Sequence, residues 1–248
     1  MSLGLSRDQW HRYFWDEGQG KVGPLPSVTS ITGLQDSLGG SDNLMRWGAG
    51  IALDYFVAHE GDETILAQPD YLTALKANAI AAMKGPANLG TEVHEQVRRC
   101  IQGEPLSLTP ETAPFIGQFA AFLAKERPEF LYAEETVLNL TAGYGGQFDI
   151  IAALRGSTGL LDVKSGKVKD SHRLQLVGYS EPDVFIGRSG TVERLELPKV
   201  EKFYILALRP DGYELLEQKI TKADREHWRT LVEFYRKAKT WTKNGVTE

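Results

Sequence analysis

Three charged residues interrupt otherwise apolar stretches of this sequence: Asp149, and Asp162 together with Lys164. Residues 159–164, Gly-Leu-Leu-Asp-Val-Lys, have the composition of a buried strand. Because side chains alternate across a strand, Asp162 and Lys164 share one face while Val163 points to the other. An unpaired charge in apolar surroundings costs several kcal/mol, so a strand that carries two charges needs a reason to keep them.

Two explanations are equally good for this strand alone. In the first, Asp149 and Asp162 lie close together, and two carboxylates that share a face need a cation between them. Hard ions such as Mg²⁺ or Mn²⁺ prefer oxygen ligands, and Lys164 would then orient or deprotonate a water or offset charge on a substrate. In the second, Asp162 and Lys164 form an internal ion pair without a chemical role.

Two elements earlier in the chain carry polar side chains that could join these residues. Thr91 is a plausible N-cap for a helix with an apolar stripe, and His94 lies at the edge of that stripe. By itself, such a histidine is more often a boundary residue than a ligand. Alternation over residues 133–138 predicts a strand with Glu134 on one face and Glu135 on the other.

The elements that follow the two aspartate strands are also readable from the pattern. A helix is expected over residues 171–180, with Gln175 and Tyr179 at i and i+4 on one face. Residues 183–200 contain glycine and proline and are expected to form a loop. A hairpin and a capped final helix complete the order, with strands expected over residues 202–208 and 213–220.

These elements predict a single α/β (α+β) domain with a mixed central sheet flanked by helices. Helical periodicity over residues 41–59 and 69–83 predicts helices there, whereas residues 10–15 fit either a strand or a short helix. The expected organisation of residues 1–248 is a mainly helical N-terminal extension over 1–89, an αβββαβ core with a hairpin over 90–220, and a C-terminal helix over 221–248.

Composition limits the classes of function. The 248 residues are 42% hydrophobic, enough to bury a full core. The net charge of −5 lacks the broad basic surface of proteins that grip duplex DNA along its length, so any contact with nucleic acid must be local. The single Cys100 excludes an intramolecular disulfide and a four-cysteine iron–sulfur cluster. No leader and no run of about 18 apolar residues is present, which predicts a cytoplasmic protein away from membranes.

A series of short motifs appears in a characteristic order: Gly90-Thr91-x-x-His94, Glu134, Gly146-x-x-Asp149, Asp162-x-Lys164 and Gln175-x-x-x-Tyr179. This series resembles the PD-(D/E)xK nucleases, in particular the RecB-like branch found in recombination exonucleases and stand-alone phage exonucleases. The resemblance covers roughly residues 90–180, and no motif matches the N-terminal third. Without four cysteines, the chain is similar to the clusterless, phage-type form.

The resemblance implies a role for each matching residue. His94, Asp149 and Asp162 would bind Mg²⁺ or Mn²⁺, together with the backbone carbonyl of Val163. Glu134 would lie near the ion, either as a further ligand or as a residue that contacts the ligands. Lys164 would position or activate the attacking water. Gln175 and Tyr179 would face the DNA backbone or brace the site. From their positions alone, three basic residues are expected to contact flanking phosphates: Lys167, Lys169 and Arg173.

The function that the resemblance implies is a metal-dependent DNA exonuclease that takes part in phage-type recombination or DNA processing. Its partners would be DNA and a single-strand annealing or recombination protein. Two alternatives stay open. The chain could be a structure-specific endonuclease, or it could be a catalytically silent module that uses a nuclease fold for DNA binding or assembly.

Overall fold

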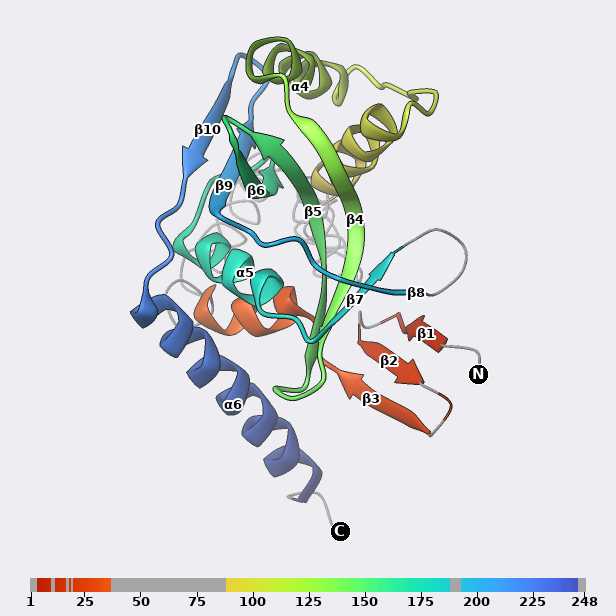
Figure 1. The fold of residues 1–248 in the computed structure, drawn as a ribbon, viewed down its shortest axis with the longest axis vertical. Helices are drawn as coiled ribbons and strands as arrows, with labels where there is room; N and C mark the ends of the chain where they lie inside the picture. Colours follow the sequence, from red (N-terminus) through yellow and green to blue (C-terminus); the bar gives the residue numbers. More distant parts are fainter. Residues whose placement is uncertain are drawn as a thin grey trace, which may run out of the picture.

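The structure, a computed structural model, describes residues 4–36, 88–187 and 193–244, apart from residues 10, 11, 17 and 19. A mixed seven-stranded sheet forms its centre. The strands are β4 (Glu129–Asn139), β5 (Tyr144–Leu154), β6 (Ser157–Lys164), β7 (Val184–Gly187), β8 (Glu193–Leu195), β9 (Lys202–Leu208) and β10 (Tyr213–Glu217). Their order in the sheet is β10-β9-β6-β5-β4-β7-β8, and β6 and β9 run parallel while the other neighbours are antiparallel (Figure 1).

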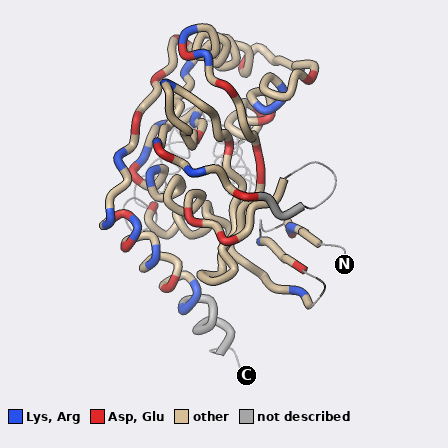
Figure 2. Tube along the Cα trace, viewed as in Figure 1, with Lys and Arg blue, Asp and Glu red and all other residues tan. Residues whose placement is uncertain are grey.

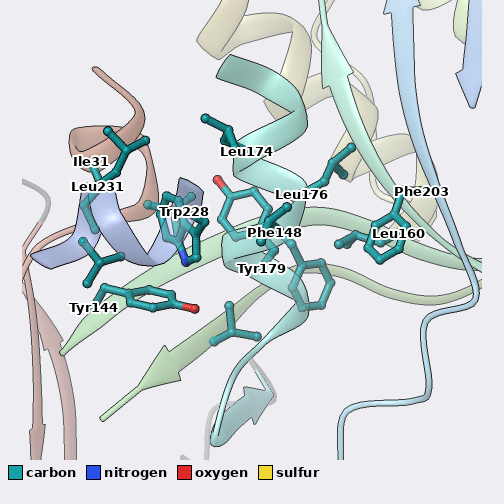
Figure 3. Close-up of a cluster of buried hydrophobic side chains, with 14 of the residues drawn as sticks. Ile31, Tyr144, Phe148, Leu160, Leu174, Leu176, Tyr179, Phe203, Trp228 and Leu231 are labelled. Carbon is teal, nitrogen blue, oxygen red and sulfur yellow. The ribbon is translucent and has the colours of Figure 1, made fainter. Parts of the chain in front are cut away.

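Helices cover both faces of this sheet. The described helices span residues 28–36 and 88–102, together with α4 (Ala113–Glu126), α5 (Asp170–Ser180) and α6 (Lys222–Asn244). The core on one face is built from α5, α6 and helix 28–36, where Trp228 packs edge-on against Tyr144, and Tyr179 and Phe148 lie in the same cluster (Figure 3). The core on the other face is built from α4 and helix 88–102. The expectation of a mixed α/β fold with flanking helices is confirmed.

The alternation expected for β6 is present. Leu160 packs into the core under α5, whereas Leu161 and Val163 pack into the core under α4. In α4 the helical spacing of Phe115, Phe119 and Phe122 places three rings on that second face, which buries a large apolar area.

The N-terminal segment begins with strands. A three-stranded antiparallel sheet is formed by β1 (Gly4–Arg7), β2 (Tyr13–Asp16) and β3 (Lys21–Leu25). It packs through Tyr13, Trp15 and Leu25 against the edge of the central sheet. The amide N–H of Gly145 then donates to the Pro26 carbonyl at 2.9 Å, which ties the segment to β5.

Several expectations need correction. The start of the predicted helical extension over residues 1–89 is a β-sheet, and the helices expected over 41–59 and 69–83 lie outside the described residues. The loop expected over 183–200 contains β7 and β8, because the short apolar run after Pro182 completes the sheet edge next to β4.

Thr91 is not an N-cap, since helix 88–102 has already begun three residues before it. Within the described part of the chain, no helix combines the length and apolar character needed to cross a membrane.

Candidate metal centre

The candidate site lies at a fork between β5 and β6. Antiparallel pairing of these strands runs up to Ile150 and Leu161, and β6 then continues beside β9. At the fork, the backbone N–H of Val163 donates to Asp149 Oδ2 at 2.6 Å. The Asp149 carboxylate therefore satisfies a buried backbone donor, and this contact fixes Asp149 beside the end of β6.

Strand β4 is distorted at the same level. Ala133 pairs with Ile150 and Glu135 with Phe148, so Glu134 lies opposite Asp149, and its φ of 59° is in the left-handed region. The left-handed φ of Glu134 interrupts the extended backbone that simple alternation assumes. Backbone strain of this kind concentrates at functional sites.

Three side chains from three elements converge at the fork. His94 Nδ1, from helix 88–102, lies 3.2 Å from Asp149 Oδ1 on β5 and 4.0 Å from Glu134 Oε1 on β4. Their ligand atoms all lie within 4.8 Å of one another. Two carboxylates and an imidazole at this spacing can coordinate a single divalent ion. The structure thus brings together His94, Glu134 and Asp149, whereas the resemblance implied His94, Asp149 and Asp162 as ligands with Glu134 nearby.

Asp162 and Lys164 lie in the same cavity but engage each other. Lys164 Nζ is 2.8 Å from both carboxylate oxygens of Asp162. It donates its hydrogen bond to Oδ1, while the buried Oδ2 accepts none from the described part of the chain. The internal ion pair considered from the sequence is therefore observed. The Lys164 ammonium therefore neutralises the buried carboxylate, and Oδ2 is held by the ion pair alone.

The protonation preferences of the cluster follow from burial and charge. Burial raises the pKa of Asp162 to about 6, although the Lys164 ammonium opposes the shift. Burial opposes ionisation of Asp149 too, but the charge and hydrogen bond of His94 outweigh it and lower the pKa of Asp149. Burial disfavours charge on His94, yet the Asp149 carboxylate outweighs burial and raises the pKa of His94. The two aspartates thus differ in their tendency to ionise.

The cavity that holds these side chains has a volume of about 440 Å³. Its walls come from β4, β5, β6, helix 88–102, α5, the N-terminal sheet and the start of helix 28–36. Gly146 permits the close packing of one wall, because a Cβ there would lie 2.6 Å from Tyr179 Cε1. Only glycine therefore fits at this position of the Gly146-x-x-Asp149 motif without displacing the tyrosine.

A second cavity of about 470 Å³ lies between the β4–β5 turn, the end of α5 and α6. Its carboxylates already have strong partners: Glu181 accepts from Arg225 at 2.6 Å, and Asp183 accepts the backbone N–H of Leu140 at 2.7 Å. These contacts account for the charges in structural terms. The smaller cavity is therefore the better candidate site, because its charges are only partly satisfied.

Gln175 and Tyr179 lie in different surroundings. Tyr179 lines the candidate cavity, and burial, followed by the charge of Asp162, raises its pKa well above the usual value. Gln175 instead faces helix 28–36, with its Nε2 3.5 Å from Thr32 Oγ1, and is not among the residues that line the cavity. Of the two roles expected for Gln175, this position fits bracing.

The three basic residues expected to contact DNA also lie outside the cavity lining. Lys167 is exposed, whereas Lys169 Nζ is 3.0 Å from Asp36 and Arg173 Nη2 is 3.1 Å from Asp224. The partner of Arg173 lies on α6, along which Lys and Arg are interspersed with Asp and Glu (Figure 2). Two of the three residues that were predicted to contact phosphate therefore form ion pairs within the fold.

Gln147 and Arg7 are among the residues of the cavity lining that were not singled out from the sequence. Gln147 donates from Nε2 to Glu134 Oε2 at 2.8 Å, and Arg7 lines the cavity from the end of β1. Gln147 lies inside the Gly146-x-x-Asp149 motif, so its position near the site could have been predicted from the sequence. Arg7 has no comparable signal, because only the packing of the N-terminal sheet brings it to the site.

The donor set fits a hard divalent cation. Glu134 and Asp149 offer carboxylate oxygens, His94 offers a nitrogen, and Asp162 adds a buried carboxylate whose Oδ2 is held only by the ion pair with Lys164. Mg²⁺ and Mn²⁺ favour such oxygen-rich sets, and Mn²⁺ also accepts imidazole.

Comparisons with known proteins add little to this geometry. No protein-family model and no curated protein matches the chain. Among solved structures, the chain is similar to the crystal structure of SSO0001, with 15% sequence identity and a TM-score of 0.27. That alignment covers 48% of this chain and 54% of the other, about half of each. The function of the chain is therefore inferred from the site itself.

Proposed function

We propose that this chain is a divalent-metal-dependent DNA exonuclease with a PD-(D/E)xK core of the RecB-like kind. One observation carries the proposal: the ligand atoms of His94, Glu134 and Asp149 lie within 4.8 Å of one another, in the cavity that also holds Asp162 and Lys164. A helix and two strands each deliver one side chain of the cluster. Convergence of partly buried charges in one cavity is a hallmark of functional sites.

The chemistry of the proposed reaction matches these parts. Phosphodiester hydrolysis is very slow without a catalyst, so a site must supply a nucleophile and neutralise charge on the phosphate. When bound, a divalent cation lowers the pKa of a water and stabilises the developing negative charge. His94, Glu134 and Asp149 would hold this ion, and the buried Oδ2 of Asp162 offers one more oxygen.

Lys164 has the geometry of a positioning group. Its Nζ donates to Asp162 Oδ1 at 2.8 Å, and this contact holds the ammonium at the cavity wall. Lysine carries three donor hydrogens, so at least one remains beside the two carboxylate oxygens to orient a water or to contact a phosphate oxygen. An ammonium held in place before the reaction stabilises charge without further reorganisation.

The exonuclease activity, the DNA substrate and a recombination partner rest on the motif resemblance. A second function is supported by a different observation, the Asp162–Lys164 pair, in which the two charges neutralise each other. That pair is compatible with a silent DNA-binding or assembly module. A structure-specific endonuclease would use the same metal centre but would not need a DNA end.

Digestion of DNA substrates distinguishes these functions. End-labelled linear, nicked and covalently closed circular DNA are incubated with Mg²⁺, with Mn²⁺ or with EDTA. We expect metal-dependent degradation of linear DNA, and no degradation of closed circles or in EDTA. Cleavage of closed circles would establish an endonuclease. Binding of linear DNA without any hydrolysis, in either metal, would establish the silent module.

Matched variants assign the activity to this cavity. Asp162→Asn and Lys164→Met are expected to abolish degradation, whereas Glu111→Gln and Lys222→Met, which change exposed residues outside the cavity, are expected to leave it unchanged. Circular dichroism verifies that each variant is folded. Full activity of the two cavity variants would assign the hydrolysis to another part of the chain.

A further inference from the structure

A chain of hydrogen bonds links the N-terminal sheet to the candidate metal cluster. Arg7 Nη1, at the end of β1, donates to Gln147 Oε1 at 3.4 Å. Gln147 Nε2 donates in turn to Glu134 Oε2 at 2.8 Å. All three residues line the cavity, so the chain of contacts runs along its wall.

Gln147 holds both the side chain and the main chain of Glu134. Its Nε2 also donates to the Glu134 carbonyl oxygen at 2.9 Å, in addition to the contact with the carboxylate. Glu134 has a φ of 59°, a conformation that costs energy for a residue with a side chain. One amide group thus stabilises the strained backbone of β4 and selects one orientation of the carboxylate.

The orientation of the Gln147 amide is itself determined by its surroundings. The NH₂ group faces two acceptors of Glu134, and the carbonyl oxygen faces a guanidinium donor. The reversed amide would set its oxygen against the Glu134 oxygens and its NH₂ against Arg7. Arg7 therefore favours the orientation in which Gln147 can hold Glu134.

We infer that Gln147 is a positioning residue for the metal cluster, and that Arg7 makes the N-terminal sheet part of the site. Gln147 occupies Oε2 of Glu134 and leaves Oε1 directed toward His94 Nδ1, 4.0 Å away. The inference rests on the proposed metal site. Partners that orient ligands in this way typically change metal affinity by about 10-fold to 100-fold.

Calorimetric titration of the full-length chain with Mn²⁺ tests the inference without any measurement of activity. The dissociation constant is compared for four proteins: wild type, Gln147→Met, Glu134→Gln and the double variant. Methionine keeps the length of glutamine but cannot donate, so Gln147→Met is expected to weaken Mn²⁺ binding by about tenfold. In the Glu134→Gln background the same change is expected to have no further effect, because Gln147 acts through Glu134.

Arg7→Met provides the second variant. Arg7 is exposed at the end of its strand, so its replacement leaves the core of the protein intact. We expect roughly threefold weaker Mn²⁺ binding, the effect of one weak hydrogen bond, and no effect in the Gln147→Met background. Gln118→Met on α4 is the matched control and is expected to bind Mn²⁺ like the wild type. Thermal unfolding monitored by circular dichroism identifies any variant that does not fold, and Arg7→Met decides the outcome if Gln147→Met is among them.

The outcomes separate this inference from the proposed function. If the wild type does not bind Mn²⁺, both are wrong, because there is no ion for Glu134 to hold. If the wild type binds but Gln147→Met and Arg7→Met bind equally well, only the positioning role is wrong. Equal losses for Gln147→Met in the wild-type and Glu134→Gln backgrounds would also overturn it, since Gln147 would then act independently of Glu134.

Discussion

Helix 88–102 presents charge in two directions, and the two charged regions differ in how well their charges are satisfied. His94 faces the buried cluster, with its Nδ1 3.2 Å from Asp149. The next residue, Glu95, joins a network outside the cavity lining in which Arg98 Nη2 lies 2.8 Å from both Glu95 and Glu104. Consecutive residues of one helix thus belong to two clusters with different surroundings.

The pKa values of two carboxylates, Glu95 in the exposed network and Asp162 in the buried cluster, are shifted in opposite directions. Hydrogen bonds from Arg98 and Arg99 lower the pKa of Glu95 to about 2, so its charge is fully matched by the network. Burial raises the pKa of Asp162 to about 6, even with Lys164 beside it. Charges that are matched within the fold need no further partner, whereas the cluster of His94, Glu134 and Asp149 sets two carboxylates against one imidazole.

The largest effect is expected when a ligand of the buried cluster loses its charge. Asp149→Asn keeps the size of the side chain and an oxygen that can accept the Val163 N–H, but it removes the charge that holds a cation. We expect hydrolysis of linear DNA to fall by about a hundredfold or more. The initial rate of release of labelled nucleotides measures the loss.

The matched control for that prediction is Glu95→Gln, which removes a carboxylate from the outward side of the same helix. It is expected to leave the rate unchanged. A comparable drop in rate for both variants would mean that the loss of either carboxylate reduces activity. The buried cluster would then not differ from the exposed network in its effect on hydrolysis.

A smaller effect, on stability, is expected from the Asp162–Lys164 pair. Lys164→Met leaves a buried carboxylate without its counter-charge, which is expected to destabilise the fold by about 3 kcal/mol at pH 8. The double variant Asp162→Asn, Lys164→Met removes both charges and is expected to recover most of that loss. Urea unfolding measures the free energies, and a double variant as unstable as Lys164→Met would show that packing, rather than charge, sets the cost.

The same pair has a defined dependence on pH. The folded-state pKa of Asp162 is raised from 3.8 to about 6, so folding favours the protonated carboxyl. The stability contributed by this group is therefore complete below about pH 3.8 and is lost as the pH rises through about 6. Asp162→Asn is expected to remove this decrease from the pH profile of the unfolding free energy.

The smallest effect is expected in the exposed network. Glu95 is 40% exposed in its side chain, so Glu95→Gln is expected to cost only about 0.5 kcal/mol at pH 7. Because the pKa of Glu95 is lowered from 4.5 to about 2, this stability is present above pH 4.5 and is lost as the pH falls toward 2. Urea unfolding at pH 7 and pH 3 measures the difference. A cost as large as that of Lys164→Met would remove the contrast between the two regions.

The sequence by itself determined the residue types of the site and the order of most elements. Alternation in β6 separated Asp162 and Lys164 from Val163, and the structure keeps them on opposite faces. His94, Glu134 and Asp149 were singled out from motifs, and they converge. Such signals are local, because the periods of helices and strands depend only on neighbouring residues.

Tertiary structure decided the rest, for reasons that lie in contacts between distant segments. The left-handed conformation of Glu134 interrupts the extended backbone of β4, and the ion pairs of Lys169 and Arg173 depend on helices far away in the chain. The contact between Arg7 and Gln147 joins residues 140 positions apart. No local period encodes such a contact. It exists because the apolar face of the N-terminal sheet is buried against the edge of the central sheet.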